Sequence, residues 1–298
     1  MEAHEQVAYP DLLARARPSW PAALWAFCRA KPLGAVGALL VACVTLTALL
    51  SPVLAPFDPF ELHRRATFLA PGGIYTMGTD NMGRDVLSRV IWGSRLSILV
   101  GVLSVALGTA VGGLLGLVSG YFGGATDMTV QRCMDALLAF PTLVLALMVV
   151  AVLGPSAGNI IIAIAIVLLP QAARVVRSSV LSIKANEYIT AARAMGSGHW
   201  RILWQHVLPN SLAPYIVVAT TALGWSIIVE ASLSFLGLGP PPPFVSWGTM
   251  LAEGGREYLS KAPWMAIFPG IALSVAVFGV NLFGDALRDV LDPRLRGS

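Results

Sequence analysis

Long apolar runs separated by short polar stretches dominate the chain, and this pattern predicts a bundle of membrane-spanning helices. About 20 helical residues, each rising 1.5 Å, cross a hydrocarbon core of about 30 Å. Residues 1–31 form a polar arm, and residues 32–57 carry no charge and predict the first span. Residues 58–95 are polar again, so they predict a loop between the first two spans.

Five more spans are expected after this loop. The charge-free run 136–173 is too long for one span and contains a turn at 154–159, so we expect it to cross twice. The sequence thus predicts an all-α membrane protein with six transmembrane helices. The core is expected at residues 96–298, with spans two to six at about 96–120, 135–153, 159–176, 211–238 and 263–284, and a tail at 285–298.

The polar stretch 184–210, between the fourth and fifth spans, is too short to cross a bilayer. Its first half predicts a helix with one apolar face at helical spacing, closed by Gly196 because glycine takes the left-handed conformation at little cost. Its second half predicts another amphipathic helix, which Pro209 ends. We expect both to lie along the membrane surface. The two expected apolar faces are Tyr188, Ala191, Ala192 and Met195, then Trp200, Leu203, Trp204, Val207 and Leu208.

Composition supports a membrane protein and excludes several other classes. Hydrophobic residues make up 56% of the 298 residues and charged residues 12%, and the mean hydropathy is +0.73, so the chain is too apolar and too poor in charge for a soluble globular protein. The net charge of +4 comes from arginines scattered over the loops, so no nucleic-acid partner is expected. The three cysteines are far apart, so neither a disulfide framework nor a metal site is expected.

The distribution of Lys and Arg predicts the orientation of the spans. With both termini in the cytoplasm, thirteen of the 20 Lys and Arg residues fall on the cytoplasmic side and seven on the outer side. Positive residues concentrate on the cytoplasmic side of membrane proteins. We therefore expect cytoplasmic termini and a cytoplasmic stretch 184–210.

The loop before the second span carries a turn and an amphipathic helix. Asp80, Asn81 and Gly83 predict the turn, and an apolar helical face follows at Val86, Leu87, Val90 and Ile91. A glycine-rich phosphate loop is excluded, because none of the three lysines follows a glycine. Any ATP would be bound by another subunit.

The stretch 184–210 resembles the EAA signature of ABC importer permeases. Ala191, Ala192, Gly196, Leu208 and Pro209 match it, with the glycine thirteen residues before the proline. The sequence departs from the signature at two positions, where Thr190 replaces the usual Glu and His206 the usual Ile. The resemblance implies that these seven residues belong to a coupling helix that sits in a cleft of the ATP-hydrolysing subunit.

Three further segments resemble the C-type permeases of dipeptide and oligopeptide ABC transporters. They are the segment MGTDNMGRDVLSRVIWGSRLSI at 77–98, the pair ASLSFLGLG and SWG within 231–248, and GDALRDVLDPRLR at 284–296. The resemblance implies a type I importer bundle in the plasma (inner) membrane that moves peptides by alternating access. The same scaffold serves glutathione, nickel and other small solutes in this family.

The resemblance also implies the partners. They are a second homologous permease, two cytoplasmic ATPases that hold ATP and Mg, and a solute-binding protein outside the membrane. The chain itself is then a transport subunit rather than an enzyme, with no cofactor of its own.

Glu230 is an ionisable residue within the fifth expected span, with Ser226 and Ser234 nearby. An ionisable group at membrane depth is costly unless it faces a cavity or a partner. The three residues could line the translocation path, or they could form interhelical hydrogen bonds that fix the packing. The sequence leaves both interpretations open.

Two other classes of function remain as alternatives. Gly154–Gly158 spell GxSxG, which is typical of serine hydrolases, but no strand precedes Ser156 and two of the candidate histidines fall on the other side of the membrane. The pattern is better interpreted as a turn between two spans. An ion-coupled secondary carrier would need neither ATP nor the stretch 184–210.

Overall fold

The computed structural model describes residues 28–291, so the first 27 residues of the polar arm and the last seven of the tail lie outside the described residues. Within the described range the chain is helical, and its extended pairings are two isolated bridges in the loop before α4. The expected all-α membrane fold is confirmed. In this range five helices are long and apolar enough to cross a membrane.

The long helices follow the expected order, with bounds that differ from the predicted ones. They are α2 (Pro32–Leu49), α4 (Val86–Phe122), α7 (Ala157–Lys184), α10 (Leu208–Leu233) and α12 (Trp264–Leu291). After α2 the chain turns at Leu50 into the short α3 (Ser51–Leu54), since Pro52 fits the first turn of a helix.

The second span differs most from its prediction. The amphipathic helix expected in the loop and the span expected from residue 96 form one continuous helix, α4. It begins at Val86 because the side chain of Asp85 accepts a hydrogen bond from the backbone N–H of Ser88 at 2.8 Å. Of the predicted apolar face, Val86 is buried, and Leu87, Val90 and Ile91 are half-buried.

The third expected span, at 135–153, is not one helix. The structure has α5 (Gly124–Leu138) and α6 (Thr142–Leu153), bent by 91° at a break around Pro141. Proline disfavours a helical conformation of the residue before it, which explains the break. If the bent pair counts as one passage, the number of passages reaches the expected six.

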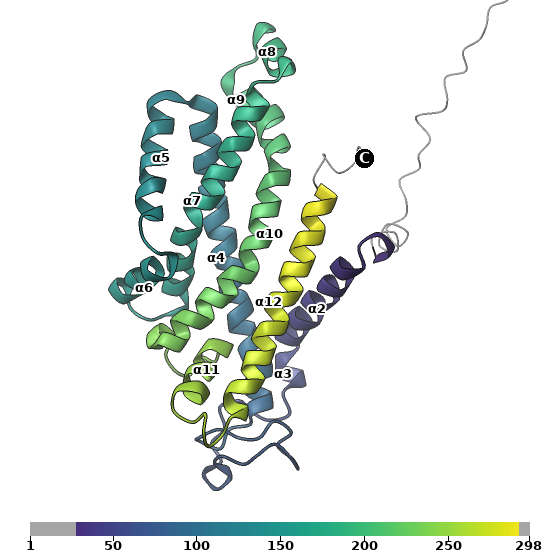
Figure 1. Ribbon diagram of the computed structural model, residues 1–298, viewed down its shortest axis with the longest axis vertical. Helices are drawn as coiled ribbons and strands as arrows, with labels where there is room; N and C mark the ends of the chain where they lie inside the picture. Colours follow the sequence, from purple (N-terminus) through teal and green to yellow (C-terminus); the bar gives the residue numbers. More distant parts are fainter. Residues whose placement is uncertain (1–27, 292–298) are drawn as a thin grey trace, which may run out of the picture.

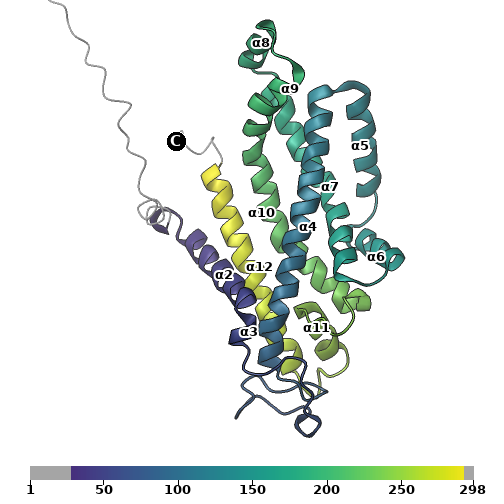
Figure 2. The ribbon, with the colours of Figure 1, turned by 180° about the vertical axis from the view of Figure 1, so that it is seen from behind.

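Figures 1 and 2 show the arrangement of the helices. α4 lies in the middle of the bundle, with α7 and α10 beside it, α2 and α12 on one flank, and α5 and α6 on the other. At one end, α8 (Glu187–Ala194) and α9 (His199–Ile202) project beyond the long helices. At the opposite end lie α11 (Trp247–Arg256) and the loop before α4. These two ends are called the α8 end and the α11 end below.

A row of small residues holds α4 against α7. Glycines stand at every fourth position from Gly108 to Gly120, so they share one face of α4, and all are buried. A Cβ added at Gly108 would lie 2.6 Å from the carbonyl oxygen of Ala165, and one at Gly112 would lie 2.5 Å from that of Leu169. The two backbones are therefore too close for any side chain, as in small-residue contacts between membrane helices.

Candidate coupling site and interior polar residues

The stretch between α7 and α10 begins with α8, whose end is set by Gly196. This glycine has φ of 80°, and its N–H donates to the carbonyl of Arg193 at 2.9 Å. The N–H of Ser197 donates to the carbonyl of Ala192 at 3.0 Å. These two bonds form a Schellman closure, which satisfies the last carbonyls of the helix and favours glycine at the left-handed position.

The second half of the stretch does not end at Pro209, contrary to the sequence prediction. α9 continues through a π-helical turn, η2 (Leu203–Val207), directly into α10. Pro209 lies in the first turn of α10, where its missing N–H costs no hydrogen bond. A π-helical turn is rare and frequently occurs at functional sites.

Three buried aliphatic side chains anchor this stretch to the bundle. Ile189 of α8, Ile202 of α9 and Val207 of η2 are fully or almost fully buried. They pack in one cluster with residues at the ends of α4 and α7, among them Leu117, Tyr121, Val176, Val180 and Ile183. The stretch is thus fixed to the bundle through its apolar core.

The predicted apolar faces are partly wrong. Met195 is 81% exposed, Trp200 65% and Trp204 57%, and Tyr188 is also exposed. Ala192, Leu203 and Val207 of the predicted faces are buried, together with Ile189 and Ile202, which the prediction left out. α8 and α9 are too short for a helical repeat to indicate which side meets the bundle.

The seven residues of the EAA-like segment lie on different sides of this stretch. Thr190, Ala191 and Gly196 are exposed on α8 and its closing turn, and Pro209 is exposed at the start of α10. Ala192 is buried against the bundle. His206 and Leu208 are half-buried, and the His206 ring centroid lies 6.1 Å from that of Tyr188.

An aromatic cluster that the sequence analysis did not single out joins this stretch to α4. The hydroxyl of Tyr121, at the last turn of α4, lies 3.2 Å from Nδ1 of His199. The Phe122 ring centroid is 6.4 Å from those of both His199 and Trp200. Tyr121 and His199 are 78 positions apart in sequence, so no local pattern could have paired them.

An apolar groove opens beside η2, between α4 and α10. It has a volume of about 310 Å³, and its lining includes Leu114 of α4, Trp204 of η2 and Leu212 of α10. Tyr215 also lines it, and Thr109 of α4 donates a hydrogen bond to the Tyr215 hydroxyl at 3.3 Å. At the α8 end, therefore, α4 and α10 are not fully packed against each other.

Toward the α11 end the same two helices are joined by polar side chains around Glu230. The Glu230 carboxylate is fully buried and accepts hydrogen bonds from Ser97 of α4 at 3.2 Å and from Ser234 at 2.9 Å. The Ser97 hydroxyl in turn accepts the backbone N–H of Trp247 at 3.1 Å. One carboxylate thus connects α4, α10 and α11.

Ser226 extends this junction by donating to the carbonyl of Gly101 at 3.2 Å. Ser226, Glu230 and Ser234 are all buried within this chain, with their polar atoms used in contacts between its own helices. This placement favours the packing interpretation over the translocation-path interpretation of the three residues. Buried polar groups in a membrane protein need such partners.

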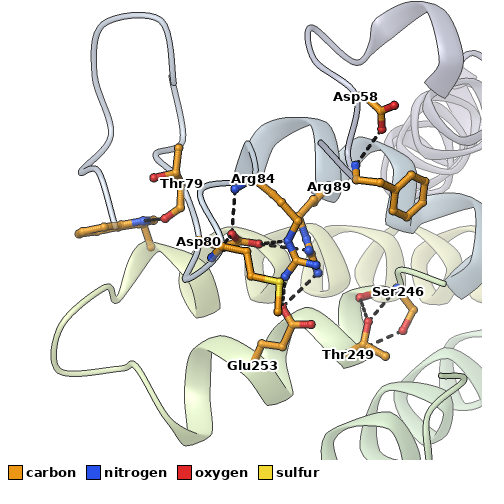
Figure 3. A network of polar contacts seen from close by, with 11 residues as sticks. Asp58, Thr79, Asp80, Arg84, Arg89, Ser246, Thr249 and Glu253 are labelled. Atoms are coloured by element: carbon orange, nitrogen blue, oxygen red, sulfur yellow. Dashed lines mark hydrogen bonds and ion pairs between the residues drawn. The ribbon is translucent and has the colours of Figure 1, made fainter. Parts of the chain in front are cut away.

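At the α11 end, four charged residues fasten the loop before α4 to α11 (Figure 3). The carboxylate of Asp80 lies 2.6 Å from Nε of Arg84 and 3.1 Å from Nη1 of Arg89. Glu253 of α11 lies 3.1 Å from both guanidinium groups. Because Asp80 and Arg89 are buried, breaking this network would leave an unpaired buried charge. The turn predicted at Asp80–Gly83 therefore helps to hold the loop before α4 against α11.

Ion pairs also join the helices at the α8 end. Arg177 of α7 makes two contacts of 2.6 Å with the Asp127 carboxylate of α5, and Arg174 lies 2.6 Å from Asp135. Such bidentate contacts fix the orientation of the two helices.

The serine of the GxSxG pattern has a structural role. Ser156 precedes α7, and its hydroxyl accepts a hydrogen bond from the backbone N–H of Asn159 at 3.1 Å. This is an N-cap, which satisfies a free donor at the helix start. The turn interpretation of this pattern therefore fits the structure.

The fold and the exposed surface stretch define a multi-pass membrane transport subunit. A family model described as "binding-protein-dependent transport system inner membrane component" matches residues 112–297. The chain belongs to this family, and its role is in transport.

Curated relatives match over most of the chain. The dipeptide transport system permease protein DppC of Alkalihalophilus pseudofirmus is 42% identical, over 89% of this chain and 86% of that protein. The di/tripeptide transport system permease protein DppC of Pseudomonas aeruginosa is 43% identical over 89% of both chains. The glutathione transport system permease protein GsiD of Pectobacterium atrosepticum is 41% identical over 87% of this chain and 86% of that protein.

A solved structure shares the fold. A chain of the MetNI methionine ABC transporter, in an inward-facing conformation, superposes with a TM-score of 0.56. The two are 19% identical, and the match covers 69% of this chain and 97% of the other. This likeness shows that the two chains share a fold.

Proposed function

We propose that this chain is the permease subunit of an importer that takes up di- and oligopeptides, driven by ATP hydrolysis on partner subunits. The stretch 187–210 receives the movement of the ATPases and passes it to the bundle. The chain then alternates between openings toward the two sides of the membrane.

The observation that carries this proposal is the construction of α8. Ile189 and Ala192 fix one side of the helix to the bundle, while Thr190, Ala191 and Met195 are exposed on a helix that projects beyond the long helices. A rigidly anchored helix with an exposed face can transmit force from a partner. A flexible loop could not, because it would absorb the displacement.

The partners are a second homologous permease, two ATPases that hold ATP and Mg, and a solute-binding protein at the α11 end. The α8 end faces the cytoplasm, so both termini are cytoplasmic and the chain lies in the plasma (inner) membrane. The excess of Lys and Arg on that side supports this orientation.

The substrate class rests on the relatives. Those named for dipeptides or di- and tripeptides are 42% and 43% identical to this chain, which supports peptides as the transported molecules. Glutathione is the second candidate, because a relative named for it is 41% identical.

The test begins with the tagged chain, purified in mild detergent from its host. A second permease and ATPases are expected to co-purify, and the complex should hydrolyse ATP. Gly196→Trp should uncouple hydrolysis from uptake or release the ATPases, because its φ of 80° is strained for a side chain. If the chain is purified alone and transport runs without ATP, the coupling proposal is wrong.

Substrate class is tested with the reconstituted complex and labelled dialanine. Unlabelled trialanine, whose peptide bonds are all α-linked, should compete for uptake more strongly than the γ-linked tripeptide glutathione does. Stronger competition by glutathione would overturn the peptide assignment and leave the coupling proposal intact.

A further inference from the structure

We propose that Tyr121 and His199 form a positioning pair, which ties the coupling stretch directly to the end of α4. α4, α7, α8 and α9 then move as one body, while α10 beyond the turn η2 moves relative to them. The inference rests on the proposed coupling function, and it adds α4 to the helices that flank the stretch in sequence, α7 and α10.

The pair joins a buried residue of α4 to an exposed residue of α9. Tyr121 is buried in the cluster that also contains Ile189 and Ile202, whereas His199 is exposed at the first position of α9. Their polar atoms lie 3.2 Å apart, and their rings are edge to face with centroids 5.9 Å apart. A displacement of α9 therefore acts on α4 through both a hydrogen bond and a ring contact.

Lys184 of α7 also contacts the end of α4 that carries Tyr121. Its ammonium group donates to the backbone carbonyl of Tyr121 at 2.6 Å and lies 3.5 Å from that of Gly120. A lysine at this place satisfies carbonyls that have no partner within the helix and interacts favourably with the helix dipole. Because Lys184 is the last residue of α7, the ends of α4 and α7 are joined where the coupling stretch begins.

From the Lys184 contact toward the middle of the bundle, α4 and α7 cannot separate or slide past each other at low cost. Their backbones meet along the glycine row, where a Cβ at Gly108 or Gly112 would fall 2.5–2.6 Å from a carbonyl oxygen of α7. Closely packed interiors transmit displacement rather than absorb it. The two helices therefore carry a movement of α8 and α9 as a unit.

α10 is connected differently at its two ends. Near the α11 end it is pinned to α4 by Ser226 and by Glu230. A π-helical turn adjoins each end of α10, η2 at the α8 end and η3 (Ser234–Leu238) at the α11 end. At the α8 end the hydrogen bond from Thr109 to Tyr215 lies beside the groove of about 310 Å³, so α10 is less fully packed against α4 there. α10 is thus held to α4 by buried hydrogen bonds far from the coupling stretch and borders free volume close to it. The end of α10 near α8 can therefore move more easily than the end near α11.

The test uses the whole complex in proteoliposomes, with binding protein, ATP and labelled dialanine. Tyr121→Phe removes one hydroxyl, and His199→Ala removes the other member from an exposed position. Each should lower the amount of dialanine taken up per ATP hydrolysed by about threefold to tenfold, the range expected for one lost hydrogen bond. The hydrolysis rate itself should stay within about twofold of the unmodified complex.

Two comparisons distinguish the loss of the positioning contact from a general loss of folding or assembly. His199→Gln keeps a polar partner for the hydroxyl and should recover most of the uptake per ATP, and the double variant Tyr121→Phe/His199→Ala should be no worse than either single one. Ser274→Ala, which removes an exposed hydroxyl bonded within α12 to the carbonyl of Gly270, should leave the ratio unchanged.

Unchanged uptake per ATP in Tyr121→Phe and His199→Ala would overturn the inference. Equal losses in His199→Gln and His199→Ala would also overturn it. The proposed function fails at a different step, since the unmodified complex would then show no ATP-dependent uptake of dialanine at all.

Discussion

The central helix α4 contacts its two neighbours in opposite ways. Against α7 it presents a row of glycines, so that backbone meets backbone along the half of the helix that leads to the α8 end. Against α10 it is held by Glu230 and Ser226 toward the α11 end and separated by an apolar groove at the α8 end. The contact with α7 is close along the glycine row, whereas the contact with α10 is close toward the α11 end and is reduced at the α8 end to side chains such as Thr109 and Tyr215 beside the groove.

This difference indicates which parts of the bundle can move relative to each other. Two helices without free volume between them form one body, because any shift costs many contacts. A groove beside a π-helical turn permits a small rotation at lower cost. α4 can therefore move together with α7 while α10 moves relative to both.

The largest expected effect comes from placing a side chain in the tight seam. Gly116→Ala puts a Cβ against the carbonyl of Ala173, which is backbone and cannot yield as a side chain would. We expect a loss of about 3 kcal/mol, seen as a lower thermal midpoint of the purified chain. Gly113→Ala is the matched control on the α10 side, where the new Cβ would meet the Tyr215 ring at 3.2 Å. Equal losses in both variants would show that the two seams are equally tight.

The polar junction of the other seam is expected to have the next largest effect. Glu230→Leu leaves the buried hydroxyls of Ser97 and Ser234 without their acceptor, which costs about 1–3 kcal/mol. Glu230→Gln keeps an acceptor oxygen and should cost less than half as much in the same thermal measurement. If Glu230→Gln instead retains full stability and loses transport, the residue acts in the translocation path and not in packing.

A smaller and local effect is expected at Gly196, on the stretch carried by the rigid side. Gly196→Ala has free space for its Cβ but must hold φ of 80°, which costs about 1–2 kcal/mol. Hydrogen exchange of the α8 amides should accelerate, while the long helices remain protected. Gly196→Asn should exchange more slowly than Gly196→Ala, since asparagine tolerates this conformation. Equal exchange in both variants would contradict the strain argument.

The smallest effect on stability is expected from filling the groove. Ala110→Phe places a ring in the free volume between α4 and α10, so the fold should remain stable while uptake falls about threefold, equivalent to roughly 0.7 kcal/mol in the balance of two states. Val111→Phe, at the neighbouring exposed position outside the groove lining, is the control. Equal uptake by the two variants would show that the groove is not needed for movement.

Much of the fold could be predicted because its signals are local. Hydrophobic runs long enough for a bilayer indicated the spans, and Gly196 marked the end of α8 through its own backbone preference. The break at Pro141 was missed, because the run 136–173 is apolar on both sides of it. Hydropathy alone does not distinguish a straight helix from a bent pair.

The candidate site could be predicted less completely. Its residue range followed from the EAA-like pattern, but the face that meets the bundle did not. Trp200 and Trp204 have the largest side chains in the stretch and are exposed, whereas Ile202 is buried. Helices this short offer fewer than three turns, so their periodicity does not select one face.

The sequence by itself determined the membrane fold, the position of the surface stretch and the glycine at its turn, since each depends on residues close together in the chain. The tertiary structure decided which partners those residues have. Tyr121 meets His199, Ser97 meets Glu230, and Arg84 meets Glu253 across separations of 78, 133 and 169 positions. Such pairs depend on how the helices are placed in the bundle, because a side chain's own sequence neighbours carry no information about the helix that packs against it.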